Sequence, residues 1–356
     1  MLPVSHEAVL KFHTHSVTTI EIDNWANRMI TGGLDQQIAF WDFSGMDASL
    51  RNFRSCIPHA GYPVKKLSFS PTSSHFIAIT GNWQIKIYDW EGVSLKETIR
   101  GDVYIKDMKN TKGHIAEVMS GQWHLNEHNT FMSGSRDGTV RLWDAESKLV
   151  GVHQQLMQKL VIKSHHKTNY RPCPVSQCCY TPDSWLIVAG AYDGTLKAWD
   201  PRGKTYQPLI LMNDAFLEGT DLTGITFFKD SKRFLVRGHD ETGMSLQYWD
   251  LRFPWDPINV WREIPNISVG TNPCLSPDES LIVTGSSHDS GVGSLKLIDS
   301  ASFEIVGKIP ISNSHVVHTV WNEKIQHLFV SSLNGEILSM FDPALSKKGI
   351  MHCSSR

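Results

Sequence analysis

The stretch FMSGSRDGTVRLWD, residues 131–144, decides the fold of this chain, because close copies of it recur along the sequence. Residues 186–200 read LIVAGAYDGTLKAWD, and residues 28–42 read RMITGGLDQQIAFWD. In each copy an aspartate precedes a tryptophan by six residues, which gives the pairs Asp35 and Trp41, Asp137 and Trp143, and Asp193 and Trp199. Recurrence of one supersecondary unit at a regular spacing is the signature of a repeat fold.

Four weaker copies complete the series, over residues 76–89, 234–250, 281–299 and 328–341. Most copies consist of a run rich in Val, Ile and Leu, a tight turn and an alternating run, which together predict a β-hairpin. The seven third-strand anchors are at positions 41, 88, 143, 199, 249, 298 and 340, and their mean spacing of about 50 residues is near that of a four-stranded blade. We therefore predict an all-β fold, a seven-bladed β-propeller of the WD-repeat type. It is expected to form a single domain over residues 1–342, followed by a C-terminal tail at 343–356.

The ends of the chain indicate how the propeller closes. The residues after Met340 are polar and poor in β-forming side chains, so they supply no outer strand for the last blade. Residues 7–12, EAVLKF, precede the first blade and have the composition of a strand without a local partner. We expect this N-terminal strand to complete the seventh blade, which also removes an exposed sheet edge.

Composition excludes several classes of function. The 356 residues are 40% hydrophobic, and 34 basic against 36 acidic side chains leave a formal charge of −2. This balance lacks the basic footprint of a nucleic-acid-binding protein, so no direct nucleic-acid contact is expected. No apolar run approaches the roughly 18 to 20 residues of a membrane span, and the six cysteines contain no CxxC pair. We expect a soluble intracellular protein with reduced thiols, no membrane association, and a monomeric state on its own.

Catalytic, cofactor and metal signatures are also missing from the sequence. His13 with His15, and His165 with His166, lack the third and fourth ligands that a metal site requires nearby. The segment 291–296, GVGSLK, lacks the spacing of a phosphate-binding loop, and no G-x-S-x-G elbow occurs. We predict a protein that is not an enzyme and uses no cofactor.

A buried hydrogen-bonded chain is expected within individual blades. In such repeats a histidine before the first strand, the turn aspartate and the tryptophan of the third strand satisfy one another's polar groups. The third blade has the full set, and the first and fourth blades have partial or complete counterparts. The predicted members are His114, Asp137 and Trp143, then His13, Asp35 and Trp41, and finally Asp193.

Two departures from the minimal repeat are candidate partner sites. The connection RGDVYIKDMKNTKGH, residues 100–114, carries Arg100, Lys106, Lys109 and Lys112 beside two aspartates. It is either a docking loop for an acidic or phosphorylated peptide or a solvated connector of mixed charge. The second departure is the pattern W-D-x-R, which occurs as Trp199, Asp200 and Arg202 and again as Trp249, Asp250 and Arg252. Arginine is common at strand ends, so the pattern alone is a weak signal.

The stretches WDFSGMDAS at 41–49, RGDVYIKDMKNTKGH at 100–114, LSPDESLIVTG at 275–285 and FDPALSKKG at 341–349 resemble the WD-repeat protein 70 family. The resemblance runs from about residue 3 to 349. It implies a nuclear protein associated with a cullin-RING ubiquitin ligase, histone ubiquitination and the DNA-damage response. In substrate receptors of that ligase class the W-D-x-R motif faces the damage-binding adaptor subunit.

Two functions are therefore compatible with the sequence. The first is a non-catalytic scaffold that binds other proteins, as an adaptor or substrate receptor of a nuclear cullin-RING ligase. The alternative is a structural WD-repeat subunit of an RNA-processing complex of the spliceosome type.

Overall fold

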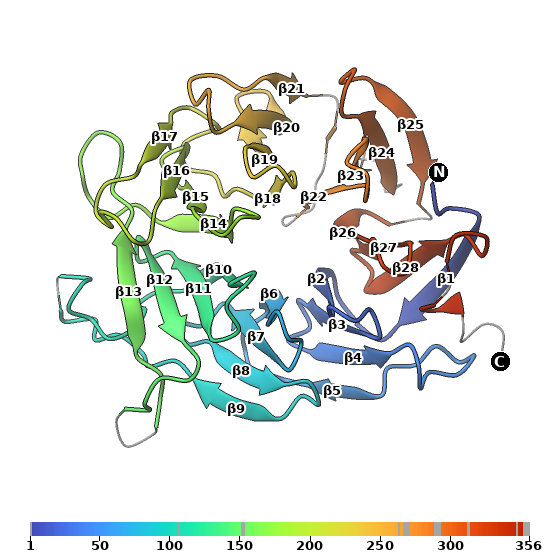
Figure 1. The fold of residues 1–356 in the computed structure, drawn as a ribbon, viewed down its shortest axis with the longest axis horizontal. Helices are drawn as coiled ribbons and strands as arrows, with labels where there is room; N and C mark the ends of the chain where they lie inside the picture. Colours follow the sequence, from blue (N-terminus) through green and yellow to red (C-terminus); the bar gives the residue numbers. More distant parts are fainter. Residues whose placement is uncertain are drawn as a thin grey trace. The chain divides into compact units, whose positions relative to one another are not determined.

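The computed structural model describes residues 2–105, 107–150, 154–262, 264–265, 271–287, 293–311, 314–346 and 348–351. Within these ranges, 28 strands form seven antiparallel sheets of four strands each (Figure 1). The predicted all-β, seven-bladed propeller is confirmed. Each predicted anchor position lies on the third strand of its blade, with the strands of the last blade counted from residue 316.

The chain divides into two compact units. Unit 1 comprises Met1–Val64 and Trp261–Arg356, and unit 2 comprises Lys65–Val260.

Unit 2 contains blades two to five, except for their first residue, Val64, and their last residue, Trp261, which belong to unit 1. Blade two is β6 (Val64–Phe69), β7 (His75–Thr80), β8 (Lys86–Asp89) and β9 (Ser94–Glu97). Blade three is β10 (Val118–Trp123), β11 (Thr130–Ser135), β12 (Thr139–Asp144) and β13 (Gln158–Lys163). Blade four is β14 (Val175–Tyr180), β15 (Ile187–Ala191), β16 (Thr195–Trp199) and β17 (Ile210–Met212). Blade five is β18 (Gly224–Phe227), β19 (Arg233–Asp240), β20 (Gly243–Asp250) and β21 (Asn259–Trp261).

Unit 1 contains the remaining three blades. Blade one is β2 (Val17–Ile22), β3 (Arg28–Gly33), β4 (Ile38–Asp42) and β5 (Arg54–Cys56). Blade six is β22 (Pro273–Leu275), β23 (Leu281–Ser287), β24 (Gly293–Asp299) and β25 (Ile305–Pro310). Blade seven is β26 (Val316–Asn322), β27 (His327–Ser332), β28 (Glu336–Phe341) and the N-terminal strand β1 (His6–Lys11).

The N-terminal strand completes blade seven as predicted. Strand β1 pairs antiparallel with β28 along its whole length, from His6 opposite Phe341 to Lys11 opposite Glu336. The Lys11 ammonium lies 2.8 Å from a Glu336 carboxylate oxygen across this pair. The first strand of the chain and the last three therefore share one sheet.

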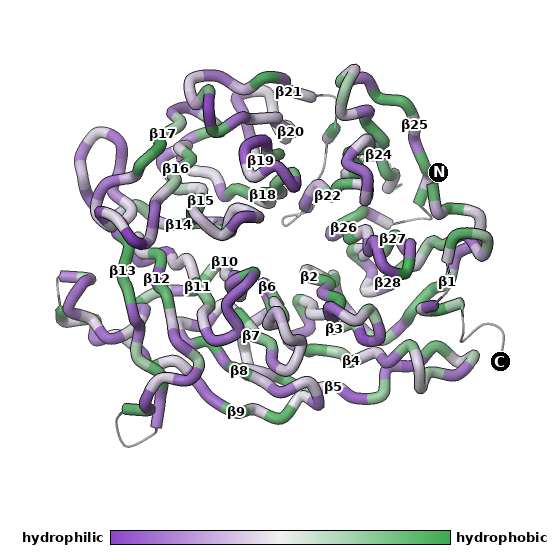
Figure 2. The backbone as a smooth tube through the Cα atoms, viewed as in Figure 1, coloured by the Kyte–Doolittle hydropathy of each residue, from purple (hydrophilic) through white to green (hydrophobic). Residues whose placement is uncertain are grey.

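The middle strands of blade three are buried on both faces because side chains of blades two and four pack against them within unit 2. All six residues of β11 are buried, and β12 is buried from Thr139 to Trp143. Their register places Phe131 opposite Trp143 and Met132 opposite Leu142, so large apolar side chains face each other across the strands. In Figure 2 the colour of the tube changes over short distances along the strands, since neighbouring residues point to opposite faces.

The segment after β28 contributes to the hydrophobic core of unit 1. Ile350 is fully buried in a cluster that includes Phe43, Met46, Ile325 and Phe329. The rings of Phe43 and Phe329 stack with centroids 6.0 Å apart. Two of the distinctive stretches of the sequence, WDFSGMDAS and the one that closes the chain, thus contribute to the same core.

No helix in the described part of the chain has the length and apolar character needed to cross a bilayer.

Candidate interaction site

A buried polar chain crosses blade three. The Nδ1 atom of His114 lies 2.8 Å from Oδ2 of Asp137, and its Nε2 atom lies 2.8 Å from the hydroxyl of Ser133. Trp143 donates its indole N–H to the same hydroxyl, also at 2.8 Å. With a neutral imidazole, the tryptophan N–H donates to the serine hydroxyl, the serine O–H donates to Nε2 of His114, and the Nδ1–H of His114 donates to Asp137.

The charge state of this chain follows from burial and its bonds. Burial lowers the pKa of His114, although the charge of Asp137 acts in the opposite direction. The imidazole is therefore neutral near pH 7. Burial alone would raise the pKa of Asp137, but His114, the Thr139 hydroxyl and Arg141 outweigh it and lower that pKa to about 2. The carboxylate is therefore ionised and fully bonded.

Blade one repeats this arrangement with threonine in place of serine. His13 contacts Asp35 at 2.9 Å through Nδ1 and the Thr31 hydroxyl at 2.9 Å through Nε2. Trp41 donates to the Thr31 hydroxyl at 3.0 Å. The hydroxyl residue that joins histidine to tryptophan was not among the predicted members of the chain.

Blade four replaces the histidine with a lysine. The buried ammonium of Lys197 bonds Asp193 at 3.0 Å and the carbonyl oxygen of His165 at 2.7 Å. Ala189 stands where a hydroxyl residue would be needed, and Trp199 has no hydrogen-bond partner for its indole N–H in the described ranges. Asp193 is thus bonded, but not to a histidine and not in a chain that reaches the tryptophan.

Arg252, the arginine of the W-D-x-R motif at 249–252, lies between β20 and β21 and folds back on Asp250 of the same motif. Its Nε and NH2 donate to the two oxygens of Asp250 at 3.0 and 2.6 Å, and its backbone N–H donates at 2.9 Å. This bonding lowers the pKa of Asp250. The aspartate is buried, whereas 55% of the arginine side chain is exposed. The guanidinium is therefore fixed in direction while one side remains open to a partner.

The second arginine, Arg202, is held differently. Its Nε donates to Asp200 at 3.1 Å, and its guanidinium lies 4.0 Å from the centre of the Trp185 ring. The side chain is 57% exposed. A guanidinium stacked on an indole gains a cation–π contact without losing its in-plane donors.

Exposed aromatic residues accompany both arginines, and sequence reasoning missed them. Trp185 is 58% exposed on the connection between β14 and β15, and Phe253 and Trp255 are 60% and 74% exposed just after Arg252. Tryptophan and arginine are enriched among the residues that dominate binding energy at protein interfaces. The sequence places Phe253 and Trp255 directly after Arg252, but only the fold brings Trp185 to Arg202. We name Trp185, Asp200, Arg202, Asp250, Arg252, Phe253 and Trp255 the arginine corners.

The predicted docking loop lies between β9 and β10. Arg100, Lys109 and Lys112 are exposed on it, and Lys106 lies outside the described residues. The guanidinium of Arg100 lies 4.0 Å from the centre of the Trp83 ring.

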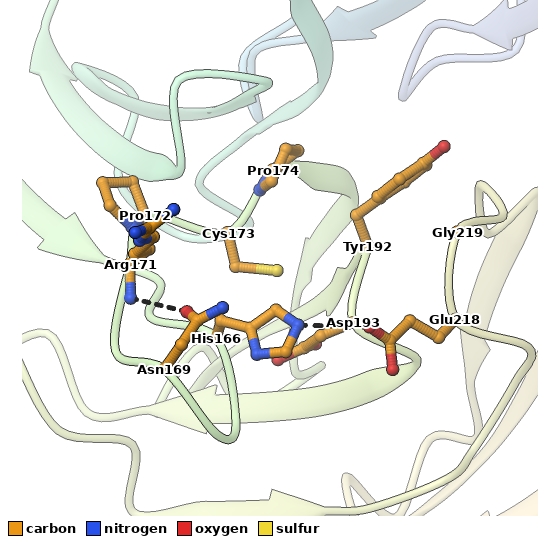
Figure 3. A pocket seen from close by; sticks show the side chains of 10 residues that line it. All are labelled: His166, Asn169, Arg171, Pro172, Cys173, Pro174, Tyr192, Asp193, Glu218 and Gly219. Carbon is orange, nitrogen blue, oxygen red and sulfur yellow. Dashed lines mark hydrogen bonds and ion pairs between the residues drawn. The ribbon is translucent and has the colours of Figure 1, made fainter.

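A pocket of about 270 Å³ opens where the entry loop of blade four meets the turn at Tyr192 (Figure 3). Figure 3 shows His166 directed at Glu218, with its Nε2 atom 3.2 Å from the carboxylate. Lys167 of the same loop bonds Asp214 at 2.8 Å, so both His166 and Lys167 pair with carboxylates of the connection between β17 and β18. No group of three or more His, Cys, Asp or Glu side chains suited to a metal ion occurs among the residues that the structure describes.

Comparisons with known proteins agree with this architecture. The family profile described as WD domain, G-beta repeat matches residues 5–42, 106–144 and 158–200. The Gastrulation defective protein 1 homolog of Drosophila melanogaster is 35% identical over 355 residues, which cover 99% of this chain and 52% of the fly protein. WD repeat-containing protein 70 of Xenopus tropicalis is 36% identical over 354 residues, or 99% of this chain and 55% of the frog protein.

The chain belongs to the WD repeat-containing protein 70 family. The human family member, WD repeat-containing protein 70 of Homo sapiens, is 36% identical over 354 residues, covering 99% of this chain and 52% of its own length. The chain thus spans about half the length of the curated relatives it matches. The family resemblance inferred from the sequence is confirmed. WD40 propellers of this kind are usually non-catalytic scaffolds, which implies a protein-interaction role.

Proposed function

We propose that the chain is a nuclear adaptor that docks on the damage-binding adaptor subunit of a cullin-RING ubiquitin ligase and presents substrates to it. The proposed contact is the arginine corners, with Trp249 and Trp199 as their buried supports. On this proposal the ligase acts in histone ubiquitination and the DNA-damage response.

One observation carries the proposal: both W-D-x-R arginines are held by their own aspartates and still expose more than half of the side chain. Fixing a guanidinium before binding lowers the entropy lost when it meets a partner carboxylate or carbonyl. The adjacent Trp185 and Trp255 supply apolar area that a single exposed arginine lacks. Together they form a contact of the composition seen in interface hot spots.

Capture of the purified damage-binding adaptor by the full chain tests this assignment. We expect the Arg202→Ala, Arg252→Ala double variant to bind at least about thirtyfold more weakly than wild type, because the loss of even one hot-spot arginine costs about 2 kcal/mol. The matched control is Arg171→Ala, an exposed arginine on the entry loop of blade four, which should bind as wild type does.

Two outcomes of this capture experiment would contradict the assignment. Equal capture by wild type and the double variant removes these arginines from the contact. Absence of capture by wild type removes the ligase role. Affinity purification from nuclei, read by mass spectrometry, then reports whether RNA-processing subunits are recovered instead.

A further inference from the structure

The loop between β9 and β10 has a closed neck formed by two glycines. Gly101 donates its backbone N–H to the carbonyl oxygen of His114 at 2.8 Å. A Cβ atom on Gly113 would lie 1.8 Å from the carbonyl oxygen of Ile99, and one on Gly101 would lie 2.1 Å from that of Gly113. Any side chain at either position would push the two strands of the neck apart, so glycine is required at both.

A buried arginine fills the interior of the loop. Arg141 on β12 donates from NH1 to the carbonyl oxygen of Thr111 at 3.0 Å and from NH2 to the Thr111 hydroxyl at 2.7 Å. It also reaches the carbonyl oxygen of Met108 at 3.3 Å. Its side chain is fully buried, so its hydrogen bonds are all to protein and fix the loop against blade three.

A second tether comes from β13, beside which the loop lies in Figure 1. The Lys163 ammonium contacts the Asp107 carboxylate at 2.7 Å, and Gln158 donates to the carbonyl oxygen of Thr111 at 2.5 Å. The hydrogen bond from Lys163 lowers the pKa of Asp107. The loop is thus attached to the third and fourth strands of its blade, β12 and β13.

The tip of this anchored loop presents apolar side chains to solvent. Tyr104 is 90% exposed and its neighbour Val103 is 52% exposed. The carboxylate of Asp102, itself exposed, accepts the backbone N–H of Tyr104 at 2.9 Å. An aromatic side chain on a loop that is already ordered binds with a small loss of entropy.

Side chains of both charges are exposed on the loop, and its flank at Lys109 and Lys112 is positive. Asp102 and Asp107 are engaged by the loop's own backbone N–H groups and by Lys163. Lys109 and Lys112 are exposed, and neither forms an ion pair with any residue in the described ranges. Lys109 and Lys112 therefore give the loop a positively charged flank next to the apolar tip at Val103 and Tyr104.

We propose that residues 100–105 and 107–113 form a preorganised docking loop for an anionic peptide segment of a partner protein. Tyr104 supplies the apolar contact, Lys109 and Lys112 contact carboxylates or phosphates, and Arg141 is a positioning residue that keeps the loop closed. The proposal is independent of the ligase assignment, because the loop shares no residue with the arginine corners.

Binding of defined peptides to the full chain, followed by fluorescence anisotropy, tests the loop. The probe is a labelled twelve-residue peptide of Glu and Ser with one central Phe, and a phosphoserine version distinguishes phosphate from carboxylate recognition. A version with Gln in place of Glu should bind about tenfold more weakly, since it lacks the charge that Lys109 and Lys112 recognise.

Two surface variants separate the apolar from the ionic contribution. Tyr104→Ala and the pair Lys109→Glu with Lys112→Glu should each weaken binding about tenfold or more. The matched controls, Tyr206→Ala and the pair Lys204→Glu with Lys232→Glu, change exposed residues elsewhere in unit 2 and should stay within about twofold of wild type.

Arg141 is tested by graded substitution. Arg141→Met should weaken peptide binding about tenfold, and Arg141→Lys, which retains a donor but not the fork, should recover part of that loss. The proposal is overturned if wild type binds neither anionic peptide, if the loop variants bind as wild type does, or if a labelled oligouridine binds more tightly than both peptides.

Discussion

In blade three the turn aspartate is bonded by a histidine, whereas in blade four the corresponding aspartate is bonded by a lysine. Both blades carry a basic residue four positions after that aspartate, Arg141 in the first and Lys197 in the second. Because His114 satisfies Asp137, Arg141 stays 3.9 Å from that carboxylate and reaches the docking loop instead. Lys197 instead pairs directly with Asp193 and donates in addition to the carbonyl oxygen of His165.

The comparison shows that one buried position can serve stability or function, depending on its neighbours. A buried carboxylate needs a bonding partner. In blade three that partner is a neutral histidine, so Arg141 is available for a contact elsewhere. The blade without the histidine uses its cation for the pair and leaves the Trp199 indole N–H without an acceptor in the described ranges.

The largest expected difference between the two blades concerns removal of the aspartate charge. Asp193→Asn should cost about 3 kcal/mol of unfolding free energy, because it leaves a buried ammonium with only neutral acceptors. Asp137→Asn should cost about 1 to 2 kcal/mol, because a neutral His114 can donate to the amide oxygen. Urea unfolding of the full chain measures both values, and equal losses would contradict the distinction.

Acid stability should report the state of Asp137. Its pKa in the folded chain is about 2, below the ordinary value of 3.8, so its contribution is complete above pH 3.8 and is lost as the pH falls through 2. The lost contribution is about 2 kcal/mol, from the size of that shift. We expect the unfolding free energy of wild type to fall more steeply between pH 5 and about pH 2 than that of Asp137→Asn. Parallel curves would show that Asp137 does not have this pKa.

A smaller difference should separate the two tryptophans. Trp143→Phe removes a donor to Ser133, whereas Trp199→Phe removes an indole N–H that has no acceptor among the described residues. Both variants lose ring volume, so the difference isolates the hydrogen bond, and Trp143→Phe should be less stable by about 1 kcal/mol. Thermal unfolding monitored by circular dichroism compares them. A larger loss for Trp199→Phe would reverse the assignment.

Much of the fold followed from local patterns. The seven anchors and the N-terminal strand were predictable because turn chemistry and hydrophobic alternation are encoded by neighbouring residues. The hydroxyl that links histidine to tryptophan also has a local signal. Thr31 and Ser133 each lie four residues before the turn aspartate, where blade four has Ala189.

Other features depend on contacts between distant residues. The sequence shows WDFSGMDAS at 41–49 as a distinctive stretch, but the burial of Phe43 in one cluster with Ile350 brings together residues about 300 positions apart. It shows a basic residue at position 141, but whether that side chain reaches Asp137 or Thr111 depends on the path of a loop some 30 residues away. The exposure of Trp185 and Trp255 beside the arginines is equally a product of tertiary structure.

Amide hydrogen exchange over residues 101–112 tests most directly whether Arg141 holds the loop while its counterpart Lys197 serves only the blade. The account predicts that Arg141→Met accelerates exchange at Gly101, Ile105 and Asn110, whose N–H groups are bonded within the loop and its neck. It predicts that Lys197→Met leaves these amides unchanged relative to global unfolding. Loop exchange that is unaffected by Arg141→Met, or accelerated equally by both variants, would contradict it.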